Sequence, residues 1–241
     1  MGFLKYFSII AFAMLCSFSI FAQPAQVVEG GEVLQLSSGI EEVSLNRSES
    51  KIRNASVVVR DIEDGSYGSG TLFKIDDRNI IITAKHVVGN RSTMAVVGRA
   101  DETVVGTVIY VDPNYDFAML SVPDMITREP MRFRIENDRN IVGMNTTYTG
   151  HPAGHDLLTL RGRIAGIDTR SKSYLMHGYA WMGASGSCVF SLDGKLIGVL
   201  YAVDVGRFYG PHIVEDIIWI TPISEIDIRE ILLRVQVHGQ Q

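Results

Sequence analysis

Short runs rich in Val, Ile, Thr and aromatic residues recur along the chain from Lys51 onward, and they constrain the fold more than any other feature. Examples are ASVVVRDI, NIIITA, TVVGTVIYV, SCVFSL and KLIGVLYAV, and such runs are separated by Gly, Asn, Asp or Pro. These residue types favour strands, and turn formers at such close spacing favour antiparallel hairpins. No strand alternates with a long helix before the last residues, as a parallel sheet would require. The sequence therefore predicts an all-β sandwich or barrel.

The period of the apolar residues changes near the end of the chain. In TPISEIDIREILLRV, residues 221–235, apolar side chains recur at near-helical spacing, and Pro222 and Ser224 can open a helix. We therefore expect a C-terminal helix laid on the β-domain.

The first residues have the pattern of a secretory signal peptide. Lys5 precedes an apolar stretch from Phe7 to Phe21, and the small residue Ala22 comes before the polar letters QPAQ. The apolar stretch is shorter than the roughly 20 residues of a membrane span, so an uncleaved anchor is the lesser alternative. We expect residues 1–22 to be a signal peptide and residues 23–50 a linker or propeptide. A secreted or periplasmic protein without a stable membrane anchor would result.

The charge of the chain argues against a nucleic-acid partner, and its cysteine content argues against an internal disulfide. The formal net charge is −5 over 241 residues, and no basic run marks a nucleic-acid surface. Once the signal peptide is removed, Cys188 is the single cysteine, so no internal disulfide can form. We expect Cys188 to be a small buried apolar residue and not a nucleophile. Nothing in the sequence fixes an oligomeric state.

Ser185 stands between glycines in YAWMGASGSCVF, residues 179–190. A short Gly/Ser pattern is more often a turn than a reactive site, and a serine hydroxyl needs a base and a carboxylate to become a nucleophile. The candidate base is His86, because it follows the apolar run NIIITAK directly, and a strand end positions an imidazole rigidly.

Two aspartates in VDPNYDFAML could supply the carboxylate. Asp112 precedes Pro113, a turn pattern that predicts a solvated side chain. Asp116 opens the apolar strand Phe117–Val122, where a buried carboxylate needs a donor such as a histidine N–H. We therefore expect Asp116 to pair with His86.

Gly183 can adopt backbone angles that other residues avoid. Its N–H group and that of Ser185 can therefore converge on one point and stabilise an oxyanion.

The order His86, Asp116, Ser185, within TAKHVV, DFAML and GASGSCVF, resembles that of the chymotrypsin-like (trypsin-like) serine endopeptidases. The chain is most similar to their disulfide-poor bacterial branch, namely the glutamyl endopeptidases (V8-like) and the Deg/HtrA proteases. Further matches are GSGTLF, YTGHPAG followed by LRGRIAG, LDGKLIGVLYA and IIWITPISEI. Together they cover roughly residues 55–235.

The resemblance implies a double six-stranded antiparallel β-barrel over residues 51–236, with the barrels meeting near 125–140 and a tail at 237–241. It implies hydrolysis of protein or peptide substrates through an acyl-enzyme, without a metal or organic cofactor. Ser185 would attack the carbonyl, His86 would move its proton, and Asp116 would orient His86. The N–H groups of Gly183 and Ser185 would form the oxyanion hole.

The chain departs from the glutamyl branch at two positions. A histidine fifteen residues after the nucleophile is Leu200 here, and a threonine five residues before it is Ala180. Strict cleavage after Glu is therefore not expected, and an apolar or small side chain fits better. Tyr201, Ala202 and Val203 would lie along the substrate backbone, with an ordinary buried strand as the alternative.

Two other functions are compatible with the same residues. One is a catalytically silent protease-fold binding module, and the other is an esterase that uses the same triad. The complete set of triad and glycine residues favours an active protease.

Overall fold

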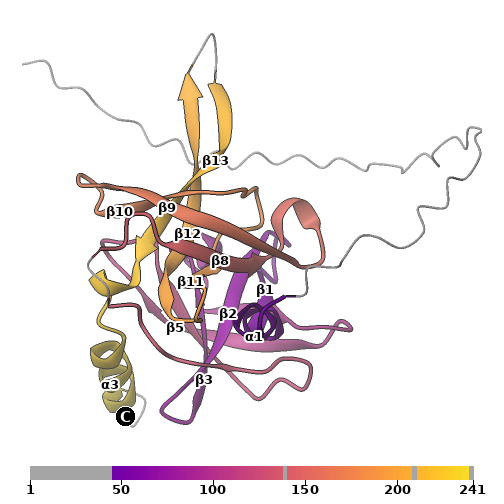
Figure 1. Cartoon of the computed structure of the whole chain (residues 1–241). Helices are drawn as coiled ribbons and strands as arrows, with labels where there is room; N and C mark the ends of the chain where they lie inside the picture. Colours follow the sequence, from indigo (N-terminus) through magenta and orange to yellow (C-terminus); the bar gives the residue numbers. More distant parts are fainter. Residues whose placement is uncertain (1–44, 138–139, 208–210, 239–241) are drawn as a thin grey trace, which may run out of the picture. The chain divides into compact units, whose positions relative to one another are not determined.

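Six strands from the first half of the chain close into an antiparallel barrel (Figure 1). The structure, a computed structural model, describes residues 45–137, 140–207 and 211–238. The barrel closes because β1 pairs with both β2 and β4. Its strands are β1 (Ser56–Arg60), β2 (Tyr67–Ile75), β3 (Arg78–Thr83), β4 (Thr93–Val97), β5 (Thr103–Val111) and β6 (Ala118–Val122).

A second closed barrel follows, in the strand order β10-β13-β12-β11-β8-β9. Its strands are β8 (Asn145–Gly150), β9 (Leu158–Asp168), β10 (Ser173–His177), β11 (Cys188–Ser191), β12 (Leu196–Arg207) and β13 (Pro211–Pro222). β12 and β13 continue beyond their other neighbours as a two-stranded hairpin (Figure 1). The expected double six-stranded barrel is thus confirmed.

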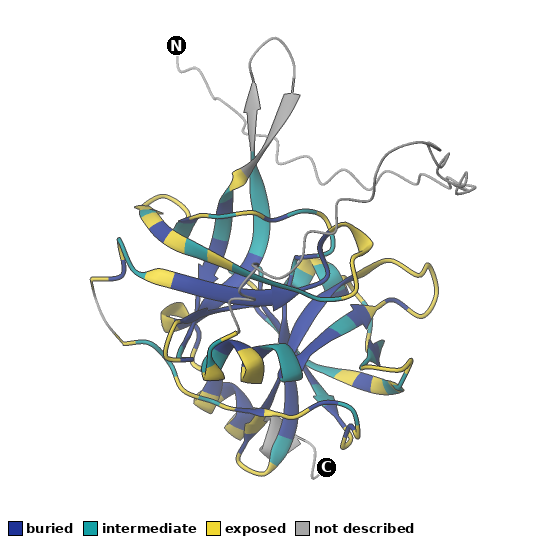
Figure 2. Cartoon of the chain, turned by 45° about the vertical axis from the view of Figure 1, so that its right-hand side comes forward, coloured by how far each residue is buried: buried dark blue, intermediate teal, exposed yellow. Residues whose placement is uncertain are grey.

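Buried apolar side chains form two clusters, one mainly in the first barrel and one in the second (Figure 2). The strands β2, β3, β6, β8 and β11 are buried over most of their length, whereas β5 and β9 are mostly half-buried or exposed. β3 shows why the sequence folds this way, since Ile80, Ile81 and Ile82 are all fully buried. Gly70 on β2 allows close packing there, because an added Cβ would lie 2.7 Å from Ile81 Cγ2 and 2.9 Å from Val59 Cγ2.

Among the strands that the structure describes, one pairing departs from the all-antiparallel expectation. The two-residue strand β7 (Met131–Arg132), in the connection between the barrels, pairs with β2 in parallel. It extends the first barrel's sheet at the β2 side.

A helix precedes the first strand and was not expected from the sequence. α1 (Arg47–Ala55) begins with a capping box, in which Asn46 Oδ1 accepts from Glu49 N and Glu49 Oε2 accepts from Asn46 N, both at 2.9 Å. Glu49 is buried and accepts from Arg161 Nε on β9 at 2.5 Å. The helix α1 therefore contacts the second barrel, whereas β1, which follows it directly in the chain, belongs to the first barrel. It occupies residues 47–50 of the segment expected to be a linker or propeptide, and residues 1–44, including the expected signal peptide, lie outside the described residues.

The C-terminal helix is present as expected, but it begins later. After the short 3-10 helix η2 (Ile223–Glu225), α3 (Ile228–His238) starts with Asp227 Oδ1 accepting from Glu230 N at 2.9 Å. Ile228, Ile231 and Leu232 pack into the core of the first barrel. Among the residues that the structure describes, no helix has the length and apolar character needed to cross a bilayer.

Candidate active site

His86 lies on α2 (Lys85–Val88), a short helix that starts two residues after β3. Two hydrogen bonds hold residues 83–85, which precede His86. Thr83 Oγ1 donates to Ser69 O, and Lys85 Nζ donates to Asp112 O, both at 2.7 Å. Gly89, with φ +53°, ends the helix and donates to Lys85 O. The imidazole is therefore held on a rigid strand end while 47% of the side chain remains exposed.

Asp116 contacts His86 through both carboxylate oxygens. Its Oδ2 lies 2.7 Å from His86 Nδ1, and its Oδ1 accepts from His86 N at 3.0 Å. A carboxylate at Nδ1 keeps the proton of a neutral imidazole on that atom, so Nε2 is left as a proton acceptor. Thr221 Oγ1, at the end of β13, donates to Asp116 O at 3.3 Å and ties the aspartate segment to the second barrel.

The expected burial of the two aspartates was wrong, since Asp112 was expected to be solvated and Asp116 to be buried. Asp112 is buried rather than solvated, at 6% exposure, whereas the Asp116 side chain is 25% exposed. The turn pattern itself is present, since Asp112 Oδ1 accepts from Asn114 N and Tyr115 N. The Tyr110 hydroxyl then donates to Oδ2 at 2.7 Å, and these donors compensate the buried carboxylate.

Ser185 lies in the loop between β10 and β11, and this loop packs against β2 and the end of β3. Ser69 N donates to Ser185 O at 2.7 Å. A Cβ on Gly68 would lie 2.5 Å from Val87 Cγ2 and 2.8 Å from Ser185 O, so glycine lets the loop and α2 approach the same point. Gly186 has φ +88°, and its Cβ would lie 2.1 Å from Ser69 O. The backbone at Ser185 therefore adjoins the helix that carries His86.

The peptide groups around Gly183 and Ser185 are held at their carbonyl oxygens. Ala153 N donates to Met182 O at 2.7 Å, and Ser187 N donates to Ala184 O at 3.0 Å. Ala153 belongs to the 3-10 turn η1 (Pro152–Gly154) and has φ +54°. Within the described part of the chain, the N–H groups of Gly183 and Ser185 donate to no protein acceptor.

His151, just before η1, borders the same loop and was not singled out as a site residue. An added Cβ on Gly183 would lie 2.4 Å from His151 O. The His151 side chain is buried, which lowers its pKa to about 4, with a further contribution from Arg128. It is therefore uncharged at neutral pH.

The residues expected to contact substrate have different environments. Ala180 and Leu200 are buried within the core of the second barrel. Tyr201, Ala202 and Val203 lie on β12 and are partly exposed. β12 bulges at Tyr201, between the pairs Leu200↔Ile220 and Ala202↔Trp219, and the Tyr201 hydroxyl lies 2.9 Å from Ser173 Oγ.

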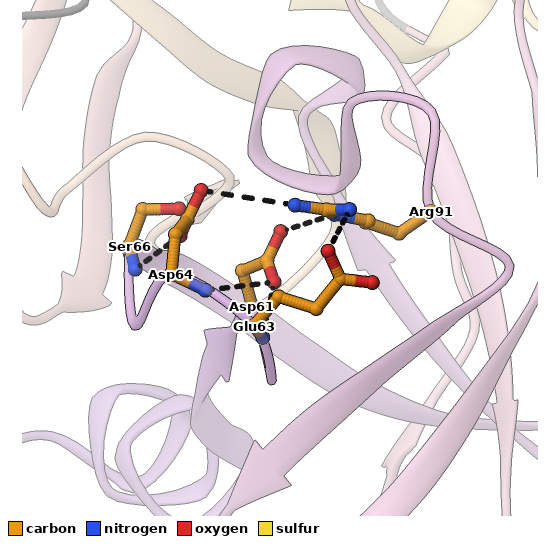
Figure 3. Close-up of polar contacts among 5 residues, drawn as sticks. All are labelled: Asp61, Glu63, Asp64, Ser66 and Arg91. Carbon is orange, nitrogen blue, oxygen red and sulfur yellow. Dashed lines mark hydrogen bonds and ion pairs between the residues drawn. The ribbon is translucent and has the colours of Figure 1, made fainter.

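An ion-pair cluster fixes the chain that follows α2 (Figure 3). Arg91 donates to Asp61 Oδ2 at 2.6 Å and to Glu63 Oε2 at 2.5 Å, and Arg91 Nη2 lies 3.9 Å from Asp64 Oδ2. The pKa of Asp61 is lowered, first by the Glu63 backbone N–H and then by Arg91. The cluster joins the His86 segment to the β1–β2 hairpin. Sequence reasoning missed it, because Arg91 and Asp61 lie 30 positions apart.

Cys188 fulfils its expected structural role. It is fully buried, and burial raises the pKa of its thiol to about 12. A protonated, inaccessible thiol is a poor nucleophile.

The chain is similar in sequence to curated bacterial proteins. It is 26% identical over 197 residues to a "Serine protease HtrA-like" of Staphylococcus epidermidis, covering 73% of this chain and 32% of the relative. A protein of the same description from Staphylococcus aureus (strain USA300) is 27% identical over 179 residues, covering 66% of this chain and 22% of the relative. The chain thus spans a third or less of the curated relatives it matches.

Solved structures share the fold at lower identity. The serine endoprotease of Yersinia pestis superposes with a TM-score of 0.63 at 20% identity, over 81% of this chain and 68% of that one. The active form of a protease from M. tuberculosis gives a TM-score of 0.63 at 19% identity, over 79% and 84%.

A family model, the trypsin-like peptidase domain, matches residues 68–199, from the start of β2 through the Ser185 loop into β12. Since this match covers more than half of the chain, the protein belongs to the family of trypsin-like peptidase domains.

Proposed function

We propose that the chain is a serine endopeptidase that hydrolyses peptide bonds through an acyl-enzyme. Ser185 attacks the carbonyl, His86 takes the proton from Ser185 and gives it to the leaving amine, and Asp116 holds His86 in the required tautomer. The observation that carries the proposal is the double contact of Asp116, at 2.7 Å with His86 Nδ1 and at 3.0 Å with His86 N. A carboxylate that contacts ring and backbone of one histidine restrains both the position and the rotation of the imidazole.

The packing of the Ser185 loop supports the same assignment. Gly68 packs against both the Val87 side chain and the Ser185 carbonyl. Because Val87 directly follows His86, the backbones of His86 and Ser185 lie near the same residue of β2. Proximity of base and nucleophile is what the chemistry requires, because proton transfer works only within hydrogen-bond reach.

Orientation of the peptide groups supports the oxyanion hole. A trans peptide directs its C=O and N–H in opposite directions. Since Met182 O is bound by Ala153 N and Ala184 O by Ser187 N, the N–H groups of Gly183 and Ser185 point away from these donors. Two fixed, uncommitted N–H groups next to the nucleophile are suited to stabilise a tetrahedral intermediate.

Side-chain specificity for small or apolar residues follows as part of the proposal. Ala180 and Leu200 are packed among apolar side chains of the second barrel, including Ile218 and Ile220. Both side chains are almost fully buried, so they bear on specificity by replacing the polar histidine and threonine of the glutamyl branch, and they supply no partner for a glutamate carboxylate, whose burial unpaired would be costly. Preference for small or apolar residues before the scissile bond is expected in place of strict Glu specificity.

Residues 1–22 support a secreted or periplasmic location. The apolar stretch from Phe7 to Phe21, followed by Ala22, fits cleavage before Gln23. N-terminal sequencing of the protein exported by a bacterial host should begin at Gln23 or, if a propeptide is removed, further along the chain. An N-terminus at Met1 in exported protein would contradict this location.

Digestion of a peptide library by the purified protein, followed by mass spectrometry, tests the proposed activity. The wild type should generate new peptide termini and Ser185→Ala should generate none. Asp112→Asn serves as a matched control and should cleave like the wild type, because the Asn side-chain oxygen can still accept from Asn114 N and Tyr115 N, and its NH₂ group can donate to the Tyr110 hydroxyl. A folded wild type that cleaves nothing would identify a silent binding module, and turnover of esters alone would identify an esterase.

A further inference from the structure

Ser69 contacts both residues whose N–H groups form the proposed oxyanion hole. The residue is fully buried on β2. Its backbone N–H donates to Ser185 O at 2.7 Å, and its hydroxyl donates to Gly183 O at 2.7 Å. One residue of the first barrel thus binds the nucleophile loop, which belongs to the second barrel, at two carbonyl oxygens.

The same residue is bound from two further directions. Ser69 Oγ accepts from His151 N at 3.0 Å, at the end of β8, and Ser69 O accepts from Thr83 Oγ1 at 2.7 Å, at the end of β3. Ser69 therefore joins the chain before His86, the chain before η1 and the loop that carries Ser185.

We propose that Ser69 is a positioning residue, whose hydroxyl fixes the orientation of the Gly183 peptide groups and thereby preorganises the oxyanion hole. This inference rests on the proposed peptidase function. It concerns Ser69 acting through Gly183 and Ser185, since the Ser69 hydroxyl is committed to Gly183 O and His151 N.

The backbone of Gly183 shows why a restraint is needed there. Its φ is +95°, a conformation that glycine adopts and leaves freely because it has no Cβ. Met182 O and Ala184 O are held by Ala153 N and Ser187 N, and the Gly183 carbonyl between them is held by the Ser69 hydroxyl. Without that hydroxyl, the Gly183–Ala184 peptide keeps only the bond from Ala184 N to Trp181 O at 2.9 Å. The Gly183 carbonyl then has no partner, and the adjoining N–H groups of Gly183 and Ser185 are held less tightly towards the oxyanion.

Ser69→Ala removes the hydroxyl and keeps the bond from the residue-69 N–H to Ser185 O. Loss of a whole oxyanion-hole donor lowers kcat by roughly 10²–10³-fold in a serine protease. The Ser69→Ala variant keeps the N–H groups of Gly183 and Ser185 but holds them less well in position, so kcat should fall by a smaller factor, about 10- to 100-fold. KM should change by less than about twofold, because the interaction is one that strengthens in the transition state.

The experiment measures kcat and KM on a fluorogenic peptide chosen from the library cleavages. Rates are divided by the concentration of active sites, counted by complete reaction with a fluorophosphonate. Thr71→Val is the matched control, because Thr71 is equally buried two residues along β2, and its hydroxyl faces the Cys188 thiol on β11 and not a carbonyl of the Ser185 loop. The control should keep kcat per site within about twofold of the wild type.

A lower kcat per site in Ser69→Ala, with KM and the Thr71→Val control unchanged, supports the inference. Fewer active sites with an unchanged kcat per site would show that Ser69 only stabilises the fold, and would overturn it. If Ser69→Ala does not fold, Ser69→Cys replaces it, since a thiol has the same connectivity but is a weaker donor, and the same fall in kcat per site is expected. A wild type that neither cleaves peptides nor reacts with the fluorophosphonate overturns the proposed function itself, and the role of Ser69 with it.

Discussion

The carboxylate of Asp116 binds His86 twice, at the backbone N–H at 3.0 Å and at ring Nδ1 at 2.7 Å. The two residues come from different segments, α2 and the turn before β6, which the pairing of β3 with β6 brings together. The sheet of the first barrel therefore fixes the histidine and its partner before any substrate binds.

Asp116→Asn should lower kcat for peptide cleavage by roughly 10³–10⁴-fold, because an amide can donate to Nδ1 and select the wrong imidazole tautomer. Steady-state kinetics on a library-derived peptide would measure this loss. Asp112→Asn, four positions earlier in the chain, should stay within about twofold of the wild type. Equal losses in the two variants would mean that Asp116 has only a structural role.

Gly186→Ala should destabilise the fold far more than Gly65→Ala. Both glycines have positive φ, +88° and +75°, so each alanine carries a backbone cost of roughly 1–2 kcal/mol. The Gly186 Cβ would also lie 2.1 Å from Ser69 O and 2.2 Å from Thr83 Oγ1, whereas no atom lies within 4 Å of a Cβ at Gly65. Urea unfolding of both variants tests this, and similar free energies of unfolding would contradict the close packing of the Ser185 loop.

Glu49→Gln should lower the free energy of unfolding by about 1–2 kcal/mol at pH 7, because a buried carboxylate loses its charged bonds to a half-exposed Arg161. Glu63→Gln, at a carboxylate that is 71% exposed beside Arg91, should cost less than about 0.5 kcal/mol. A larger loss of free energy of unfolding in Glu63→Gln than in Glu49→Gln would contradict the conclusion that the Glu49–Arg161 pair holds α1 on the second barrel.

The difference between wild type and Glu49→Gln should also depend on pH. The pKa of Glu49 is lowered from 4.5, first by its hydrogen bond with Arg161. A carboxyl with a lowered folded-state pKa contributes stability above pH 4.5, and this contribution is lost as the pH falls through the folded-state pKa. Urea unfolding should therefore show a constant difference between the two proteins from pH 7 down to about pH 5, and a difference that narrows as the pH is lowered below 4.5. A difference in free energy of unfolding that grows as the pH falls would contradict a stabilising ion pair between Glu49 and Arg161.

Cys188 should not react with iodoacetamide at pH 8 until the protein unfolds. Its thiol is buried, and its pKa is raised to about 12, so both access and ionisation disfavour alkylation. Peptide mapping at increasing urea would locate the carboxamidomethyl group. Rapid alkylation of Cys188 in native protein, with loss of activity, would reopen the possibility of a cysteine nucleophile.

The sequence predicted those features that depend on local patterns. Runs of β-branched residues such as Ile80–Ile82 do form buried strands, and Gly183 does adopt a positive φ. The helix α1 was missed although its capping box can be read at Asn46 and Glu49, because much of its support is the contact with Arg161, 112 positions away. Such a contact has no signature in the residues around it.

Burial was harder to predict than conformation. The Asx turn at Asp112 follows from the Asp-Pro pattern, but its burial depends on Tyr110 and on Lys85, whose Nζ binds the Asp112 carbonyl. Likewise, Ala180 and Leu200 occupy the core of the second barrel because strands distant in sequence pack around them. Local sequence rules predict the turn at Asp112, but its burial depends on side chains that the tertiary structure brings next to it.

Reaction of the purified protein with a fluorophosphonate at neutral pH, followed by peptide mapping, tests most directly whether the 179–190 loop carries an activated serine. We predict a single covalent adduct on Ser185, absent from Ser185→Ala and formed far more slowly by Asp116→Asn. A folded wild type that stays unlabelled, or an adduct on another residue, would contradict the proposed catalytic mechanism.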